Sequence, residues 1–163
     1  MKKLMLCIAG VVAALALVTP GVAGAATVPV TGTITAGTLD CDFAGGTLTG
    51  QMFRFSCEGT ETLTGGLSGT GSFDQVFSLN LASGELLTTG TETFVGCVGT
   101  NCGTLDWEFQ ASGKFDIQTN TLISAHGETH ITGGTGDLAG ASGSFTLTAV
   151  SESVSTYKGV VVF

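Results

Sequence analysis

Apolar and polar residues alternate along most of the chain beyond residue 26, and apolar residues nowhere recur at helical spacing over three turns. Segment 105–111 is the clearest case, because its leucine, tryptophan, phenylalanine and alanine share one face while its acids and glutamine occupy the other. This pattern is typical of a half-buried antiparallel strand. The same alternation predicts strands over residues 28–36, 47–57, 62–73, 75–82, 85–95, 114–118, 121–132, 143–150 and 153–163.

Short polar turns separate these strands, which favours antiparallel pairing because parallel strands need longer crossover connections. Glycines inside the strands, such as Gly32, Gly90 and Gly127, weaken a flat sheet but allow the bulges and bends that a barrel needs to close. We therefore predict an all-β fold, namely a closed antiparallel β-barrel of about eight strands of the calycin-like kind.

The first 25 residues have the features of a secretory signal peptide. Lys2 and Lys3 form a positive n-region, residues 4–18 form an apolar h-region, and the small residues 23–25 form a cleavage site. The 15 apolar residues are fewer than the roughly 20 that span a bilayer as a helix, which disfavours a retained anchor. We predict cleavage after Ala25 and one barrel domain over residues 26–163, secreted or otherwise extracytoplasmic, in the periplasm or at the cell surface.

The acidic charge of the chain limits the kinds of molecule that it can bind. The chain has 13 acidic and 5 basic side chains, and two of the basic ones are lysines of the signal segment. A phosphate-binding surface needs clustered Lys and Arg, so nucleic acid is excluded as a partner. After the signal segment no apolar run approaches membrane-spanning length, so we expect no stable membrane span after cleavage.

Cys7 lies in the signal segment, so four cysteines remain after cleavage: Cys41, Cys57, Cys97 and Cys102. An even number in an exported chain indicates disulfides, and three connectivities are possible. Loop closure favours Cys97 with Cys102, which leaves Cys41 to pair with Cys57. A zinc site is the alternative, although the paired Cys-x2-Cys spacing of such sites is missing.

A glycine-rich stretch occupies residues 131–145. It has no Lys-Ser/Thr after the glycines, as a P-loop would, and no long helix follows that could hold a pyrophosphate. We predict a tight loop in which Gly133, Gly134 and Gly136 adopt positive φ, while Leu138 and Ala139 form a short plug.

This stretch, Ile-x-Gly-Gly-Thr-Gly-Asp-Leu-Ala-Gly-Ala-x-Gly, resembles the hairpin signature of the allene oxide cyclase-like barrel superfamily, which includes the plant dirigent proteins. Residues 103–116 are similar to a second stretch of its small, uncharacterised secreted bacterial members, and the likeness covers roughly residues 92–148. The resemblance implies an eight-stranded antiparallel barrel with an apolar lumen that is often oligomeric, so a homo-oligomer is possible. None of the polar lumen residues of the plant enzymes matches a position here, so their reactions do not carry over.

His126, Glu128 and His130 are the candidate metal ligands. On a strand they share one face at steps of about 7 Å, and two such histidines could share a metal ion. The competing interpretation is a solvated outer face, because Ile123, Ala125 and Ile131 are the natural core positions. We favour the outer face, and we expect no cofactor.

Carboxylates also recur on shared faces, as Asp40 with Asp42 and Asp106 with Glu108. Both pairs lie opposite apolar faces, which indicates exposed charge rather than glycosidase chemistry. Arg54 alternates with two phenylalanines, so it either binds an anionic ligand in the lumen or forms an outward salt bridge.

Trp107 and Phe109 are the candidate ligand-binding residues of the apolar lumen, together with Arg54. We predict a secreted binding or structural module whose lumen takes a small hydrophobic ligand or is filled by its own side chains. The first alternative is an isomerase or cyclase that shapes a hydrophobic substrate in a dry pocket with few catalytic groups. The second is an outer-membrane barrel, which the scarcity of aromatic girdle residues disfavours. No recognisable catalytic constellation occurs, so we lean away from an enzyme.

Overall fold

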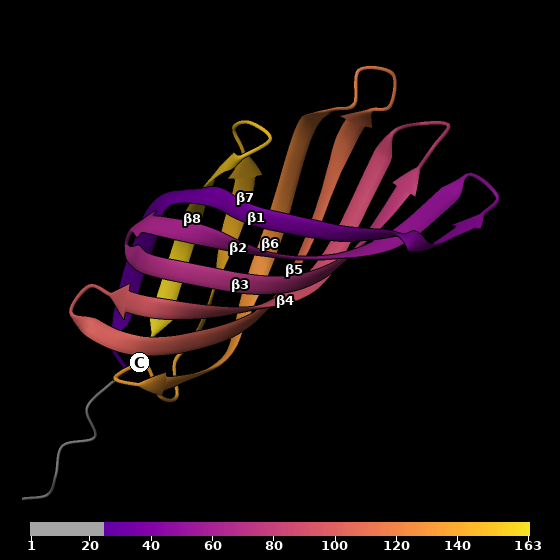
Figure 1. Cartoon of the computed structure of the whole chain (residues 1–163). Coiled ribbons are helices and arrows are strands. Elements are labelled where there is room, and N and C mark those ends of the chain that lie inside the picture. Colours follow the sequence, from indigo (N-terminus) through magenta and orange to yellow (C-terminus); the bar gives the residue numbers. More distant parts are fainter. Residues whose placement is uncertain (1–24) are drawn as a thin grey trace, which may run out of the picture.

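The computed structural model describes residues 25–163, and the predicted signal segment lies outside the described residues except for Ala25. Eight antiparallel strands follow one another in chain order, and β8 pairs with β1 to close a barrel (Figure 1). The predicted all-β barrel of eight strands is confirmed. No helix within residues 25–163 is long and apolar enough to cross a membrane. The strands are β1 (Thr27–Thr49), β2 (Met52–Gly65), β3 (Leu67–Asn80), β4 (Glu85–Val98), β5 (Asn101–Asp116), β6 (Thr121–Gly136), β7 (Ser142–Ala149) and β8 (Val154–Val162).

The strands are longer than the alternation predicts, because several predicted breaks are bulges rather than turns. β1 continues past residue 36 through two register shifts, after Ala36 and after Asp42. The predicted strand over 62–73 is wrong, because Gly65, at a φ of 103°, begins the turn between β2 and β3. Only glycine adopts that backbone conformation without strain, so the chain reverses there.

The strands are strongly tilted with respect to the barrel axis. A row of paired residues that starts at Cys41 on β1 does not return to its starting point but reaches β1 again at Val30. This displacement is the shear that closes a tilted barrel. The row consists of Cys41, Cys57, Gln75, Gly90, Phe109, Thr129, Phe145, Gly159 and Val30.

One end of the barrel is filled by side chains. The hairpins β2–β3, β4–β5 and β6–β7 turn here, and the backbone N–H of Ala26 donates to the carbonyl of Phe163 at 3.0 Å. We call this end the packed half. Its largest fully buried side chains are Trp107, Tyr157, Phe94, Leu63, Leu67, Leu105, Leu138, Val30, Val98 and Val161.

Aromatic contacts organise the packed half. The Trp107 ring lies 5.9 Å from Phe94 and meets the Phe145 ring edge-on at 5.2 Å. The Tyr157 hydroxyl accepts a hydrogen bond from the backbone N–H of Leu67 at 2.7 Å and donates to carbonyl oxygens of the β2–β3 turn. Buried polar groups are costly unless paired, so this satisfied hydroxyl fixes the turn to the core.

The glycine-rich stretch differs in part from its prediction. Gly133 and Gly134 lie within β6, and Gly136 (φ 65°) and Gly140 (φ 78°) carry the positive φ angles of the turn that follows. Leu138 is fully buried and plugs the barrel as predicted, but Ala139 is exposed. In this turn the residue three positions after Leu138 points inward, so Ala141 is buried in place of Ala139, at 4% exposure.

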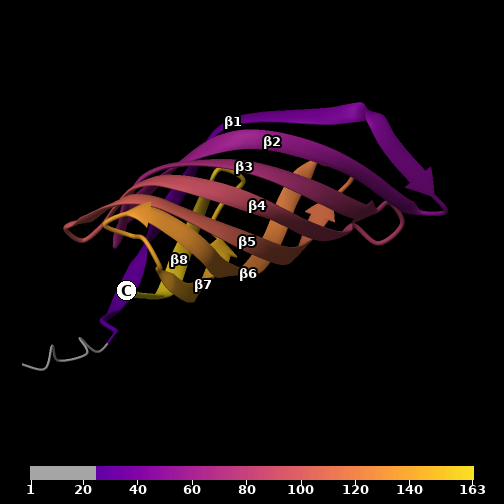
Figure 2. The ribbon, with the colours of Figure 1, turned by 90° about the horizontal axis from the view of Figure 1, so that it is seen from below.

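At the other end the ring of hydrogen bonds is incomplete. β1 has no β8 partner beyond Thr35, and β6 has no β7 partner before His126. The hairpins β1–β2, β3–β4 and β5–β6 extend past this point, and the β1–β2 hairpin lies farthest from the C-terminus (Figures 1 and 2). We call segments 37–58, 75–90 and 109–125 the open half.

Candidate functional site

The inner face of the open half carries a cluster of aromatic rings that the fold covers only in part. Phe55 stacks against Phe53 and Phe77 with ring centroids 5.3 and 5.2 Å apart, and Phe43 packs on the same ring at 4.9 Å. We call these four residues the phenylalanine cluster. Phe43 is 60% exposed and the neighbouring Leu48 is 59% exposed. Exposed apolar surface of this extent marks a binding surface more often than an ordinary monomer surface.

Local backbone features of β1 hold the cluster in place. The Asp42 carboxylate accepts a hydrogen bond from the Gly45 N–H at 2.7 Å and so closes the second bulge of β1. A Cβ at Gly46 would lie 2.6 Å from the Phe53 ring, so the glycine gives that ring its room. These contacts turn the tip of the hairpin so that Phe43 reaches Phe55.

Both predicted disulfides are present. Cys41 pairs with Cys57 across β1 and β2, and Cys97 pairs with Cys102 across the β4–β5 turn. The first bond joins two directly opposed residues in the part of β1 that has no β8 partner and so crosslinks this part to β2. Two disulfides are compatible with an oxidising, extracytoplasmic location.

Two glutamates meet inside the barrel, at the junction of the open and packed halves. Glu61 on β2 and Glu92 on β4 reach toward each other across Gly71 of β3, and a Cβ at Gly71 would collide with the Glu92 carboxylate. Glu92 is only 7% exposed, and its Oε2 accepts a hydrogen bond from the Trp107 indole N–H at 3.0 Å. Oε1 of each glutamate is buried, and no N–H or hydroxyl donor of residues 25–163 reaches it. We call these two residues the carboxyl pair.

The carboxyl pair holds a proton at neutral pH. Burial, the charge of Glu61 and the hydrogen bond to Glu61 raise the pKa of Glu92 to about 10, against a smaller opposing effect of the Trp107 N–H. Burial also raises the pKa of Glu61, whereas the hydrogen bond with Glu92 lowers it. Two adjacent buried carboxyls cannot both ionise cheaply, so Glu92 stays protonated and donates to Glu61.

Neither member of this pair was among the candidates from the sequence. A signal was nevertheless there: Glu92 is two positions from Phe94, and Glu61 is two positions from Leu63, so each lies on an apolar strand face. Their meeting depends on the register of β2, β3 and β4, which the alternation alone does not fix.

The three predicted ligand-binding residues lie in different places. Trp107 is 1% exposed and belongs to the packed half. Phe109 is half-buried on the inner face, and its ring covers Gly90, where a Cβ would lie 2.6 Å from Cζ. Arg54 is exposed on the outer face, opposite Phe53 and Phe55, so it does not line the lumen.

The candidate metal ligands also face outward. His126, Glu128 and His130 are all exposed, and His126 Nδ1 lies 3.3 Å from the Thr148 hydroxyl. Within residues 25–163 no three His, Cys, Asp or Glu side chains are grouped closely enough to hold a metal ion. The exposed Asp106 accepts a hydrogen bond from Thr93 at 2.7 Å, which is an ordinary outer-face contact.

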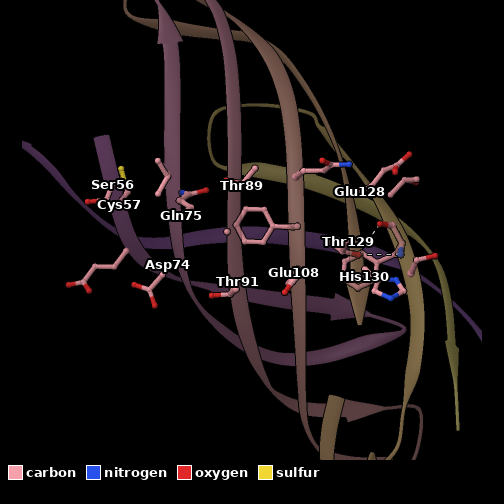
Figure 3. Close-up of a pocket in the computed structure, with 18 of the residues that line it drawn as sticks. Ser56, Cys57, Asp74, Gln75, Thr89, Thr91, Glu108, Glu128, Thr129 and His130 are labelled. Carbon is pink, nitrogen blue, oxygen red and sulfur yellow. Dashed lines mark hydrogen bonds between the residues drawn. The ribbon is translucent and has the colours of Figure 1, made fainter. Parts of the chain in front are cut away.

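A concavity of about 1580 Å³ follows the row from Cys41 to Gly159 around the barrel (Figure 3). Outward side chains border it on both sides, and Cys57, Thr129 and Phe145 of the row itself are 4, 3 and 2% exposed. It is therefore a groove on the outer surface and not the lumen. Its charged lining is mostly acidic and consists of Asp40, Asp42, Glu58, Asp74, Glu108, Glu128 and Lys158.

No model of a protein family and no curated protein matches the chain. Among solved structures, the chain is similar to the crystal structure of a protein of unknown function from the DUF3224 family of Shewanella oneidensis MR-1. The two superimpose with a TM-score of 0.67 and 17% sequence identity, over 85% of this chain and 98% of the other. At this identity the likeness shows the fold alone.

Proposed function

We propose that the protein is an extracytoplasmic binding protein that holds a small hydrophobic ligand against the inner face of the open half. The observation that carries this proposal is the partly exposed phenylalanine cluster on the inner face of the open half, where Phe43 and Leu48 are 60 and 59% exposed. A hydrophobic ligand seated there would remove apolar surface from water at roughly 25 cal/mol per Å².

Two further features support the location and the kind of site. The disulfides and the predicted signal peptide agree with export. The resemblance to allene oxide cyclase-like barrels, whose lumen is apolar, agrees with a ligand on the inner face.

An isomerase or cyclase acting on such a ligand is the second candidate. The protonated Glu92 favours it, because a carboxyl that stays neutral at physiological pH can donate its hydrogen bond to a substrate oxygen in place of Glu61. Conversion of a bound hydrophobe during incubation with the purified protein would support this candidate over simple binding.

The test of the binding proposal uses the neutral dye Nile red. We expect the fluorescence of the dye to rise on addition of the protein. The affinity for the dye should fall at least severalfold in Phe55→Ser, which removes the centre of the phenylalanine cluster. Leu87→Ser is the matched control, because Leu87 is 54% exposed on the outer face of β4. Equal loss in both variants, or no dye binding by the unmodified protein, would contradict the proposal.

A further inference from the structure

We propose that the carboxyl pair is the polar anchor of the ligand site and that it binds the ammonium group of an apolar amine. This inference rests on the proposed function, because the amine's apolar body would occupy the inner face. It starts from two buried carboxyl oxygens, Oε1 of Glu61 and of Glu92, that no N–H or hydroxyl donor of the described chain reaches. The Trp107 N–H fixes Oε2 of Glu92, which leaves Oε1 directed at Glu61 across Gly71.

Nothing in the described chain neutralises the pair. The bases of residues 25–163 are Arg54, Lys114 and Lys158, and each is exposed on the outer face. Both histidines also face outward. Without a ligand, a shared proton is therefore the group that keeps the two carboxyls together. A cation from outside could take the place of that proton, and the acidic surface of the barrel attracts cations.

The surroundings fit an organic ammonium better than a metal ion. Calcium takes six to eight oxygen ligands, whereas the strand partners of Glu92 are Phe73 and Trp107, and Gly71, which lies between the two carboxyls, pairs with Phe94. An ammonium group needs only about three acceptors, and aromatic faces stabilise it through cation–π attraction. The same rings accommodate an apolar body, which a metal ion lacks.

The inner face connects the pair with the open half. Glu61 is partly exposed, so solvent reaches the pair through this residue rather than through Glu92. One inward position toward the open half, the half-buried rings of Phe73 and Phe109 cover Gly59 and Gly90. Beyond them the inner face continues to the phenylalanine cluster. An amine bound at the pair can thus direct its apolar chain along this face.

Binding of the amine has a defined proton balance. The amine arrives as R–NH3⁺, the pair gives up its shared proton to solvent, and the ammonium donates hydrogen bonds to Glu61 and Glu92 in its place. One proton is released for each amine bound at a pH where the free pair holds one proton. An alcohol of the same chain length would bind the apolar face without releasing a proton.

The experiment compares n-octylamine with n-octanol as competitors of Nile red bound to the full exported protein, and it measures proton release by calorimetry in two buffers. We expect octylamine to compete about tenfold better than octanol, which corresponds to about 1.4 kcal/mol, with release of one proton. Glu92→Gln should abolish this preference and the proton release while leaving octanol competition unchanged. Glu58→Gln, which makes the same replacement on the exposed face of β2, should change neither.

Several outcomes separate this inference from the proposed function. If octanol and octylamine compete equally, the amine anchor is wrong and the hydrophobic site stands. If Glu92→Gln keeps the amine preference, the pair is not the anchor. If neither compound nor the dye binds, both proposals are wrong. Should Glu92→Gln fail to fold, Glu61→Gln at the partly exposed member serves as the second variant, and fluorescence of Trp107, the single tryptophan, reports whether the core is intact.

Discussion

The open half of this barrel continues six of the eight strands of the packed half with the same alternation of apolar and polar residues, yet aromatic side chains are exposed in one half and buried in the other. Trp107 and Phe94 are 1 and 0% exposed, whereas Phe43 is 60% exposed. The difference follows from closure. All eight strands surround the packed half and Leu138 plugs it, while β1 and β6 lack partners in the open half. An apolar strand face thus becomes core only where the ring of strands is complete.

The two halves therefore have different roles in the protein. The packed half supplies stability through buried apolar surface. The open half exposes apolar surface to water, which is unfavourable. Its β1–β2 hairpin is held by the hydrogen bond between Gly45 and Asp42 at the bulge and by the Cys41–Cys57 disulfide. The carboxyl pair lies where the two meet.

Truncation in the packed half should have the largest effect. Trp107→Ala removes contacts with Phe94 and Phe145 and leaves the Glu92 carboxyl without its indole donor, so we expect a loss of roughly 3 to 5 kcal/mol. Urea denaturation followed by far-ultraviolet circular dichroism measures it. A loss below about 1 kcal/mol would mean that the tryptophan lines an open cavity and that the halves are not distinct.

Removal of the disulfides should have the next largest effect on stability, and the two bonds should differ in size of effect. The Cys41–Cys57 bond closes a 16-residue separation and the Cys97–Cys102 bond a separation of 5, so removal should cost about 3 and about 2 kcal/mol in the chain-entropy model. Double serine variants compared by denaturation test this order. The reverse order would show that the open half does not depend on its crosslink.

A pH titration of stability should reveal the carboxyl pair at the junction. The pKa of Glu92 is raised in the folded protein from 4.5 to about 10, so the folded state binds more protons than the unfolded state between these values. Stability should be complete below about pH 4.5 and should fall as the pH rises toward 10, by up to roughly 4 kcal/mol between pH 5 and 8.

Glu92→Gln is the control for this titration. Glutamine does not titrate, so the stability of the variant should decline much less as the pH rises. A profile that is the same in both proteins would show that other groups cause the decline.

The smallest effect on stability should come from the open half. Phe43→Ser removes a side chain that is 60% exposed, so we expect a change within about 1 kcal/mol together with weaker Nile red binding. Denaturation and dye titration of the same sample measure both. A large loss of stability would place Phe43 in the core and remove the contrast with Trp107.

The sequence predicted the fold class because alternation depends on local chemistry that persists in the structure. It predicted the strand at 105–111 for the same reason, and it predicted both disulfides because an even number of cysteines and a short loop between Cys97 and Cys102 leave Cys41 to pair with Cys57. The turn at Gly65 was missed because a glycine pair within an alternating run can mark either a bulge or a turn.

The candidate site was the harder part. Arg54, Trp107 and Phe109 were grouped by alternation, but a strand face does not say whether the ring around it is closed. The carboxyl pair depends on contacts between β2 and β4 across Gly71, and such register is a property of the whole sheet.

Hydrogen exchange measured by mass spectrometry, with and without a saturating neutral hydrophobe such as Nile red, distinguishes ligand binding in the open half from ligand binding in the packed half. We predict that the ligand slows exchange in peptides covering residues 39–58 and 75–88 and leaves peptides of 93–107 and 138–147, in the packed half, unchanged. Protection confined to the packed half, or no protection in the β1–β2 and β3–β4 hairpins, would contradict the account.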